Sequence, residues 1–422
     1  MKRNQENHGA DAPGVPARRA ALKLLEAVLR RGLALEQALD NAAQGVAPND
    51  RGLAHAIAAE ALRRLPDLDA MIDSATQRPL PDDAKARFAL RIALVQSLSL
   101  GTPGHAAIST VLPLVDGGPR KLVHGVFGTL NRQGATLPEP PTLPDAVALR
   151  WHAAWGDQLI EDAELVIAAP PPLDLTLREP VEFEEAVSLL PGHARLPAGS
   201  SVMELPGFEE GSFWVQDLAA SIPARLIGAG AGTALDLCAA PGGKTLQLAS
   251  AGWDVTAVDV SESRLARLRE NLERTGLAAK IVAADLLTWE PAEPVDAVLL
   301  DAPCSATGIF RRHPDVLHRV RPSLIGEMAE LQGKLFHRAS KWVKPGGVLV
   351  FATCSLEPQE GEEQLERFLA HHPDYAIDPV RGDELPEGVA PREDGSLRLL
   401  PGMLAEQGRL DGFFIVRLRR NP

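Results

Sequence analysis

The chain has 422 residues, of which 45% are hydrophobic and 23% charged, a composition typical of a globular protein with two or three domains. It has no apolar run near the ~20 residues that a membrane span requires, and the polar sequence at its start lacks a signal-peptide core, so we expect a cytoplasmic protein without a membrane partner. The formal net charge of -13 argues against nucleic-acid binding by the surface as a whole. This charge is uneven, because residues 1–140 carry +3 and the remainder -16.

The three cysteines are odd in number and lack the paired spacing of a metal site. We therefore expect free thiols in a reducing compartment and no bound metal. A chemical role is then their most informative use.

The first part of the chain reads as helices. Residues 1–16 are rich in Gly, Pro and polar side chains, and we expect them to be disordered. Residues 17–135 form the predicted helical domain, because "RRAALKLLEAVL", "NDRGLAHAIAAEALRRL" and "DDAKARFALRIALVQSL" have helical periodicity or capping signals. Asn49 or Asp50 is the expected N-cap of the second of these helices. The Pro-rich residues 136–144 predict a linker.

The rest of the chain predicts two further regions. Residues 145–230 mix a short helix with strands and loops, which indicates a small α+β subdomain. Residues 231–422 alternate apolar runs such as "TALDLCA" and "VDAVLLDAP" with helical stretches. That alternation predicts a doubly wound, mostly parallel α/β sheet of the Rossmann-like class.

Ligands of open α/β sheets bind beyond the carboxyl ends of the strands, so the residues at those ends are the candidate site. The first strand runs into "DLCAAPGGKT", a tight turn with small residues that lets a ligand approach the backbone. The predicted cofactor residues of this turn are Cys238, Ala239, Ala240, Pro241, Gly242, Gly243 and Lys244. A Walker loop would need glycine where Cys238 stands, and the dinucleotide pattern G-x-G-x-x-G is absent after the strand.

Acidic residues end the next three strands. Asp259 is placed to accept hydrogen bonds from a ribose diol, with Arg264 close behind it in the sequence, and Asp285 is placed for an adenine amino group. Asp301 ends the fourth strand. Any one of these aspartates could instead cap a helix. Together, three acids suit a cationic sulfonium better than a pyrophosphate, which favours S-adenosylmethionine as the cofactor.

The two remaining cysteines follow neighbouring strands. Cys304 comes three residues after Asp301, and Cys354 ends the fifth strand in "FATCS". Adjacent parallel strands lie about 4.8 Å apart, so both thiols can face one pocket. Arg311, Arg312 and His313 form a local basic cluster near Cys304 in the sequence and are the candidate RNA contacts, with solvated helix-start residues as the alternative interpretation.

The motifs "DLCAAPGGKT", "DAPCSATG", "RRHPD" and "ATCS" stand in an order that resembles the bacterial 16S ribosomal RNA 5-methylcytosine methyltransferases. The helical front domain is similar to the antitermination factor NusB. The resemblance implies S-adenosylmethionine-dependent methylation of cytosine carbon 5 in small-subunit ribosomal RNA through a covalent adduct, by a monomeric enzyme. It also implies that Cys354 is the nucleophile, that Cys304 handles release or the proton, and that Asp301 is a further catalytic residue.

Alternatives remain at this point. DNA cytosine methyltransferases use the cysteine of a Pro-Cys pair, which here is Cys304, so the residues alone leave the two roles open. A different RNA, such as tRNA, is a second possible acceptor. A non-catalytic RNA-binding scaffold and a nicotinamide oxidoreductase are the other functions considered; the two thiols argue against the former and the missing glycine pattern against the latter.

Overall fold

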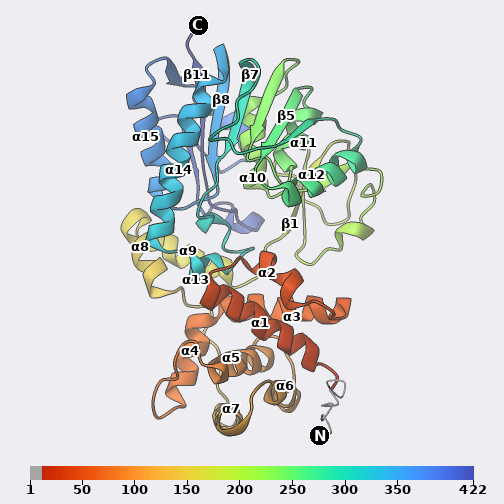
Figure 1. The fold of residues 1–422 in the computed structure, drawn as a ribbon, viewed down its shortest axis with the longest axis vertical. Coiled ribbons are helices and arrows are strands. Elements are labelled where there is room, and N and C mark those ends of the chain that lie inside the picture. The colour runs from red at the N-terminus through yellow and green to blue at the C-terminus, as the bar shows by residue number, and fades with distance from the viewer. Residues whose placement is uncertain (1–11) are drawn as a thin grey trace, which may run out of the picture. The chain divides into compact units, whose positions relative to one another are not determined.

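The structure is a computed structural model that describes residues 12–422 in two compact units (Figure 1). The first unit contains the chain up to Leu149 together with His313–Arg319, and the second contains Arg150–Arg312 and Val320–Pro422. Of the segment expected to be disordered, residues 1–11 lie outside the described part, and the first helix already begins at Val15. No helix among the described residues is both long and apolar enough to cross a bilayer.

The first unit is helical, as its periodicity predicts. Its helices are α1(Val15–Arg31), α2(Leu35–Ala42), α3(Pro48–Arg63), α4(Leu65–Ser74), α5(Lys85–Leu98), α6(Gly104–Val111) and α7(Gly117–Arg132). Helix α3 starts one residue before the expected cap, because Pro48 occupies a first-turn position where its missing N–H costs nothing. Helix α5 supplies the centre of the core, with Phe88, Ile92 and Val95 inaccessible to solvent.

The short segment His313–Arg319 also belongs to the first unit, although it lies in the second half of the sequence. It contains α13(Val316–Arg319), which packs against α1. His318 Nε2 lies 2.7 Å from the carbonyl oxygen of Leu62, and the backbone N–H of Leu35 donates to Asp315 at 3.4 Å. The division of the chain into 17–135 and 231–422 does not anticipate this exchange.

Residues 145–230 begin with two helices and a small antiparallel sheet. The elements are α8(Asp145–Trp155), α9(Asp157–Ile167), β1(Leu173–Leu177), β2(His193–Leu196) and β3(Phe213–Val215), and the strand order is β2-β1-β3. From Arg150 onward this region forms one unit with the large sheet. The next helix, α10(Leu218–Ile227), packs in the same apolar cluster as strands of that sheet, so no separate subdomain closes at residue 230.

The large sheet confirms the expected α/β class. Its strands are β4(Thr233–Leu237), β5(Asp254–Asp259), β6(Lys280–Ala283), β7(Val295–Asp301), β8(Val343–Thr353), β9(Tyr375–Ile377), β10(Leu397–Leu399) and β11(Phe413–Arg420). The order is β10-β11-β8-β7-β4-β5-β6, with β9 also paired to β11. The five strands from β8 to β6 run parallel, whereas β11 is antiparallel to β8.

Helices cover both faces of this sheet (Figure 1). The covering helices are α10, α11(Gly243–Ser250), α12(Glu262–Thr275), α14(Pro322–Lys341) and α15(Glu362–His371). Short 3-10 helices occur elsewhere in the described chain, at η1(Leu112–Leu114), η2(Val202–Glu204), η3(Thr307–Ile309), η4(Pro358–Glu360), η5(Gly382–Glu384) and η6(Ala405–Gln407). Successive side chains of a strand point to opposite faces of the sheet, so each strand contributes to two hydrophobic cores. Leu300 packs in the core that contains α14 and α15, and Leu299 packs in the core that contains α10. In the first cluster Phe336 stacks between Phe351 and Phe368.

Candidate active site

The predicted catalytic residues and the predicted cofactor loop lie at one edge of the large sheet. Asp259 and Asp301 are the last residues of β5 and β7, while Cys238 and Cys354 directly follow β4 and β8. All four strands are parallel neighbours in the order β8-β7-β4-β5, so their carboxyl ends lie together. The sheet thus carries the cysteine pair at β7 and β8 and the cofactor loop at β4 and β5.

The two candidate catalytic cysteines lie side by side. The sulfur atoms of Cys304 and Cys354 are 3.4 Å apart, within hydrogen-bond distance for thiols, and both are partly buried. The hydrogen bond with Cys354, burial, and the negative charges of Glu360 and Asp301 raise the pKa of Cys304 well above its ordinary value. A raised pKa favours the protonated form of Cys304 at neutral pH, and either sulfur can donate in the hydrogen bond between the two thiols.

Lys244 carries the positive charge next to this pair. Its Nζ donates to Asp301 Oδ2 at 2.7 Å and lies 5.7 Å from the centre of the Phe413 ring. Burial alone lowers the Lys244 pKa, but the interactions with Asp301, Asp236 and Cys354 outweigh it and raise that pKa. The ammonium group is thus held in its charged form by Asp301 at this edge of the sheet.

The cofactor loop runs from β4 into α11. Cys238 adopts φ 61°, in the left-handed region that non-glycine residues rarely occupy, and this turns the chain out of the strand. Gly242 has φ 111°, and a Cβ there would lie 2.3 Å from Leu268 Cδ1, so only glycine fits. Burial and the nearby carboxylates raise the pKa of Cys238, which makes this third thiol unreactive.

The acids expected to bind the cofactor differ in exposure. Asp259 is only 2% exposed, and its carboxylate accepts hydrogen bonds from the N–H groups of Ala240 and Ser261 at 3.1 and 2.8 Å. Arg264 pairs with the same carboxylate at 3.3 Å and donates to the carbonyl of Ala240. Asp259 therefore fixes the shape of the loop from within. Asp285 lies two residues beyond β6, is exposed, and accepts a 2.9 Å hydrogen bond from the N–H of Leu287.

A buried acid that the sequence did not single out lies beneath this loop. Asp236, in β4, has no exposed surface; Thr245 Oγ1 donates to its Oδ2 at 2.5 Å, and its Oδ1 has no hydrogen-bond partner among the described residues. Burial raises its pKa to about 7, and the charges of Asp301 and Asp259 act in the same direction. The sequence around Asp236 does not indicate a buried acid, because aspartate is more typical of turns than of strand interiors.

The expectation that Arg311 is a surface contact for RNA is wrong. Arg311 is 2% exposed, and its guanidinium pairs with Asp411 at 2.5 Å and with Asp217 at 2.8 Å. Arg312 binds the same two acids at 3.3 and 2.6 Å and keeps a quarter of its side chain exposed. His313 is partly buried and belongs to the helical unit. The basic cluster therefore serves mainly to hold segments distant in the sequence together, because buried arginines require acidic partners.

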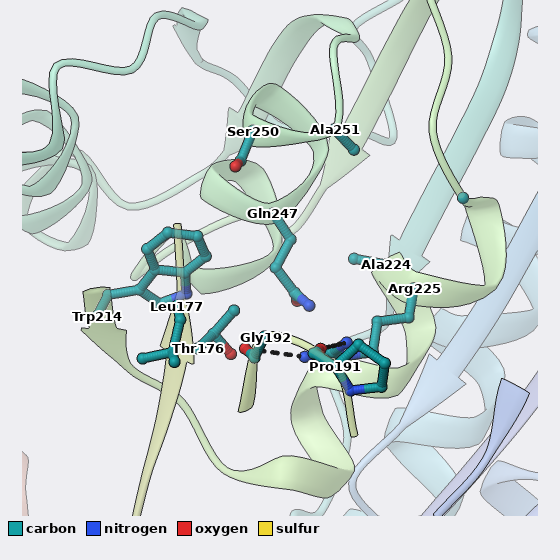
Figure 2. A pocket seen from close by; sticks show the side chains of 11 residues that line it. Thr176, Leu177, Pro191, Gly192, Trp214, Ala224, Arg225, Gln247, Ser250 and Ala251 are labelled. Atoms are coloured by element: carbon teal, nitrogen blue, oxygen red, sulfur yellow. Dashed lines mark hydrogen bonds between the residues drawn. The ribbon is translucent and has the colours of Figure 1, made fainter. Parts of the chain in front are cut away.

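A cavity of about 310 Å³ lies between the small sheet and helices α10 and α11 (Figure 2). Trp214 and Gln247 line it, and the side chain of Gln216 bonds both of them at 2.8 and 2.7 Å. Arg225 reaches across it to the carbonyl of Pro191 at 2.7 Å. None of the predicted site residues lines this cavity, and these polar groups bond to one another. The candidate active site is therefore elsewhere, at the cysteine pair. Residues 12–422 hold no cluster of His, Cys, Asp and Glu suited to a metal ion.

Comparison with known proteins gives matches over both units. The sequence model of the 16S rRNA methyltransferase RsmB/F family matches residues 228–419, and that of the NusB family matches residues 15–126. Ribosomal RNA small subunit methyltransferase B of Xanthomonas campestris pv. campestris is 35% identical over 400 residues, which cover 87% of this chain and 91% of that protein. The protein of the same name from Vibrio vulnificus is 34% identical over 94% of this chain and 97% of its own length. A solved structure of a methyltransferase homolog from Pyrococcus horikoshii superposes with a TM-score of 0.54 at 26% identity, covering 69% of this chain and 98% of that one.

Proposed function

The chain belongs to the RsmB/F family of 16S rRNA methyltransferases, and we propose that it transfers a methyl group from S-adenosylmethionine to carbon 5 of a cytosine in small-subunit ribosomal RNA. The observation that carries the proposal is the pair of free thiols 3.4 Å apart, beside the Lys244–Asp301 ion pair. Cytosine carbon 5 is too weak a nucleophile to take a methyl group directly, so the reaction requires a covalent catalyst.

The residues of the cofactor loop fit S-adenosylmethionine. Exposed Asp285 suits the adenine amino group and the charge of Asp301 suits the sulfonium, whereas buried Asp259 shapes the loop around the cofactor. We assign the hold on the cofactor to these residues, with Arg264 keeping Asp259 in place. When bound, S-adenosylmethionine supplies the methyl group and its sulfur keeps the electron pair of the broken bond.

Cys354 begins the reaction. Its thiolate attacks carbon 6 of a cytosine that has left any helical stack, and the electrons of the C5–C6 double bond make carbon 5 nucleophilic. Lys244 places a positive charge beside the thiolate, and Asp301 accepts a hydrogen bond from the cytosine amino group. Carbon 5 then takes the methyl group.

Cys304 completes the reaction. The proton on carbon 5 passes to water, its bonding pair restores the double bond, and Cys354 leaves with the electrons of the S–C6 bond. Because Cys304 keeps its proton and lies 3.4 Å from Cys354, its S–H donates to the departing thiolate. This arrangement supports Cys354 as the nucleophile and Cys304 as the releasing group.

A trapping experiment tests both the function and the roles. Wild type, Cys304→Ala and Cys354→Ala are incubated with S-adenosylmethionine and small-subunit ribosomal RNA, and protein–RNA adducts that survive denaturation are resolved on a gel. We expect Cys304→Ala to accumulate adduct, Cys354→Ala to form none, and wild type to release methylated RNA. Calorimetry with S-adenosylmethionine controls for the folding of each variant.

The other outcomes each decide a point. Adduct in Cys354→Ala but not in Cys304→Ala would exchange the two roles. Absence of both adduct and methylation in every protein, with the cofactor still bound, would contradict catalysis on this RNA. Trapping with transfer RNA but not with ribosomal RNA would move the substrate to another RNA.

A further inference from the structure

One buried carboxylate links the loops that carry the two cysteines. Glu360, at the end of η4, has no exposed surface. Its Oε1 accepts from the backbone N–H of Ser305 at 2.8 Å, and its Oε2 accepts from the hydroxyls of Ser305 and, at 2.5 Å, Ser355. Ser305 directly follows Cys304, and Ser355 directly follows Cys354. A single side chain therefore holds the residue next to each thiol.

The surrounding hydrogen bonds make this link rigid. Gln332 of α14 donates to Glu360 Oε1 at 3.0 Å, and Thr353 donates to the carbonyl oxygen of Glu360 at 2.9 Å. The loops also bond directly, since the N–H of Gly308 donates to the carbonyl of Cys354 at 3.0 Å. Glu360 is thus fixed to β8 and α14 before it fixes the cysteine loops.

The pattern of donors suits a carboxylate. Four N–H or O–H groups converge on the two oxygens of Glu360, and a carboxylate can accept all of them. In a glutamine one oxygen becomes an NH₂ group that cannot accept, so the hydroxyls of Ser305 and Ser355 must turn round and accept from it, which changes the hydrogen bonds that hold both cysteine loops. Burial of an acid at this position is costly, so a requirement of the site explains it better than stability does.

We propose that Glu360 is a positioning residue of the methyl transfer, which keeps the sulfur atoms of Cys304 and Cys354 in register so that both reach the same cytosine ring. The inference rests on the proposed function. Release suffers most when the register is lost, because it requires both sulfurs at one ring, whereas attack requires Cys354 alone.

The kinetic test compares Glu360→Gln with Glu363→Gln, which removes an exposed acid of α15 paired with Arg367. For Glu360→Gln we expect kcat to fall about 10- to 100-fold, as misplaced reacting groups do, while KM for RNA and the affinity for S-adenosylmethionine stay within about threefold. We also expect covalent protein–RNA adduct to accumulate, as in Cys304→Ala. Glu363→Gln should match wild type in every measurement.

A second readout needs no RNA and separates the positioning role from the proposed function. Mild oxidation with diamide, which takes up the two hydrogens of the thiols, should join Cys304 and Cys354 in a disulfide, because the sulfurs start 3.4 Å apart. Mass spectrometry of peptides gives the rate. We expect Glu360→Gln to slow this reaction at least fivefold and Glu363→Gln to leave it unchanged.

The results have distinct meanings. Wild-type rates of disulfide formation and methylation in Glu360→Gln would overturn the positioning role and leave the proposed function intact. Slowed disulfide formation in a series where wild type methylates no RNA would support the positioning of the thiols and contradict the function. If Glu360→Gln fails to fold, Ser355→Ala removes the contact from Glu360 to the Cys354 loop, and Ser305→Ala removes the hydroxyl contact to the Cys304 loop while keeping the backbone N–H bond. Each should then lower kcat, and their effects should not add in the double variant, because both act through Glu360; additive or absent effects would overturn the proposal.

Discussion

Replacing Asp236 by asparagine removes a carboxyl group that the fold forces to hold a proton near neutral pH. Asp236 is fully buried, and its pKa rises from 3.8 to about 7 because of burial, with Asp301 and Asp259 adding to the shift and Thr245 and Lys244 opposing it. The unfolded chain releases this proton above about pH 4, but the folded protein keeps it until about pH 7. The free energy of unfolding therefore falls as pH rises through this window and levels off above it.

The size of the effect follows from the two pKa values. The pKa of Asp236 is about 7 in the folded protein and 3.8 in the unfolded chain. This difference lowers the free energy of unfolding of the wild type by about 3 kcal/mol as the pH rises from 5 to 8. Asparagine has no proton to keep, so Asp236→Asn lacks this loss. Its amide leaves a buried N–H unpaired, which costs about 1 to 3 kcal/mol at every pH but adds no slope.

Urea unfolding at several pH values measures this slope. All six tryptophans lie in the second unit, between Trp151 and Trp342, so tryptophan fluorescence reports the unit that contains Asp236. Asp254→Asn removes the same charge from an exposed position and controls for net charge. We expect the stability of Asp236→Asn relative to wild type to increase by about 3 kcal/mol from pH 5 to pH 8. A constant difference across this range would refute the buried, protonated state of Asp236.

Two further predictions concern the Cys304 loop and helix α7, whose exposed cations suit RNA phosphates. Gly308→Ala places a Cβ 2.0 Å from the carbonyl oxygen of Gly412, so the loop must move. We expect the rate of methylation to fall about tenfold or more while the affinity for S-adenosylmethionine stays unchanged. Wild-type kinetics would show that the loop tolerates the shift. Reversing Arg120 and Lys121 on α7 to glutamate should weaken RNA binding about tenfold and flatten its dependence on salt, measured by fluorescence anisotropy at several salt concentrations; an unchanged salt slope would exclude α7 from the RNA contact.

Local signals predicted the strand-end positions of several candidate site residues. Asp259 and Asp301 end their strands as expected, and Cys354 follows β8, because apolar runs bounded by turns define buried strands without reference to the rest of the chain. The order of strands then brings these ends together through a general property of parallel sheets. The spacing of Cys304 and Cys354 does not predict which of them is the nucleophile, and the trapping experiment decides between the two roles.

Contacts between residues far apart in the sequence were not predictable. Arg311 looked like a surface residue because its partners Asp217 and Asp411 lie about 100 residues away on either side, and no pattern within the motif reveals them. The same holds for Glu360. The sequence shows a serine after each cysteine, but it does not show that both serines donate to Glu360. For α13 the missing information was its packing against α1, about 300 residues earlier. In each case the sequence supplies the residue type and the fold supplies the partner.

The placement of charges reconciles an acidic chain with an RNA substrate. In the methyltransferase unit, Arg311 is buried and paired with Asp411, so it offers little attraction to phosphates. Three acids of the site, Asp236, Asp259 and Glu360, are also buried and do not face RNA. Helix α7 of the other unit has no acidic residue and exposes Arg120, Lys121, His124 and Arg132. We therefore expect the exposed cations of α7 to attract the RNA backbone, while the buried acids contribute little repulsion. Charge reversal on α7 should accordingly change RNA affinity without changing S-adenosylmethionine affinity.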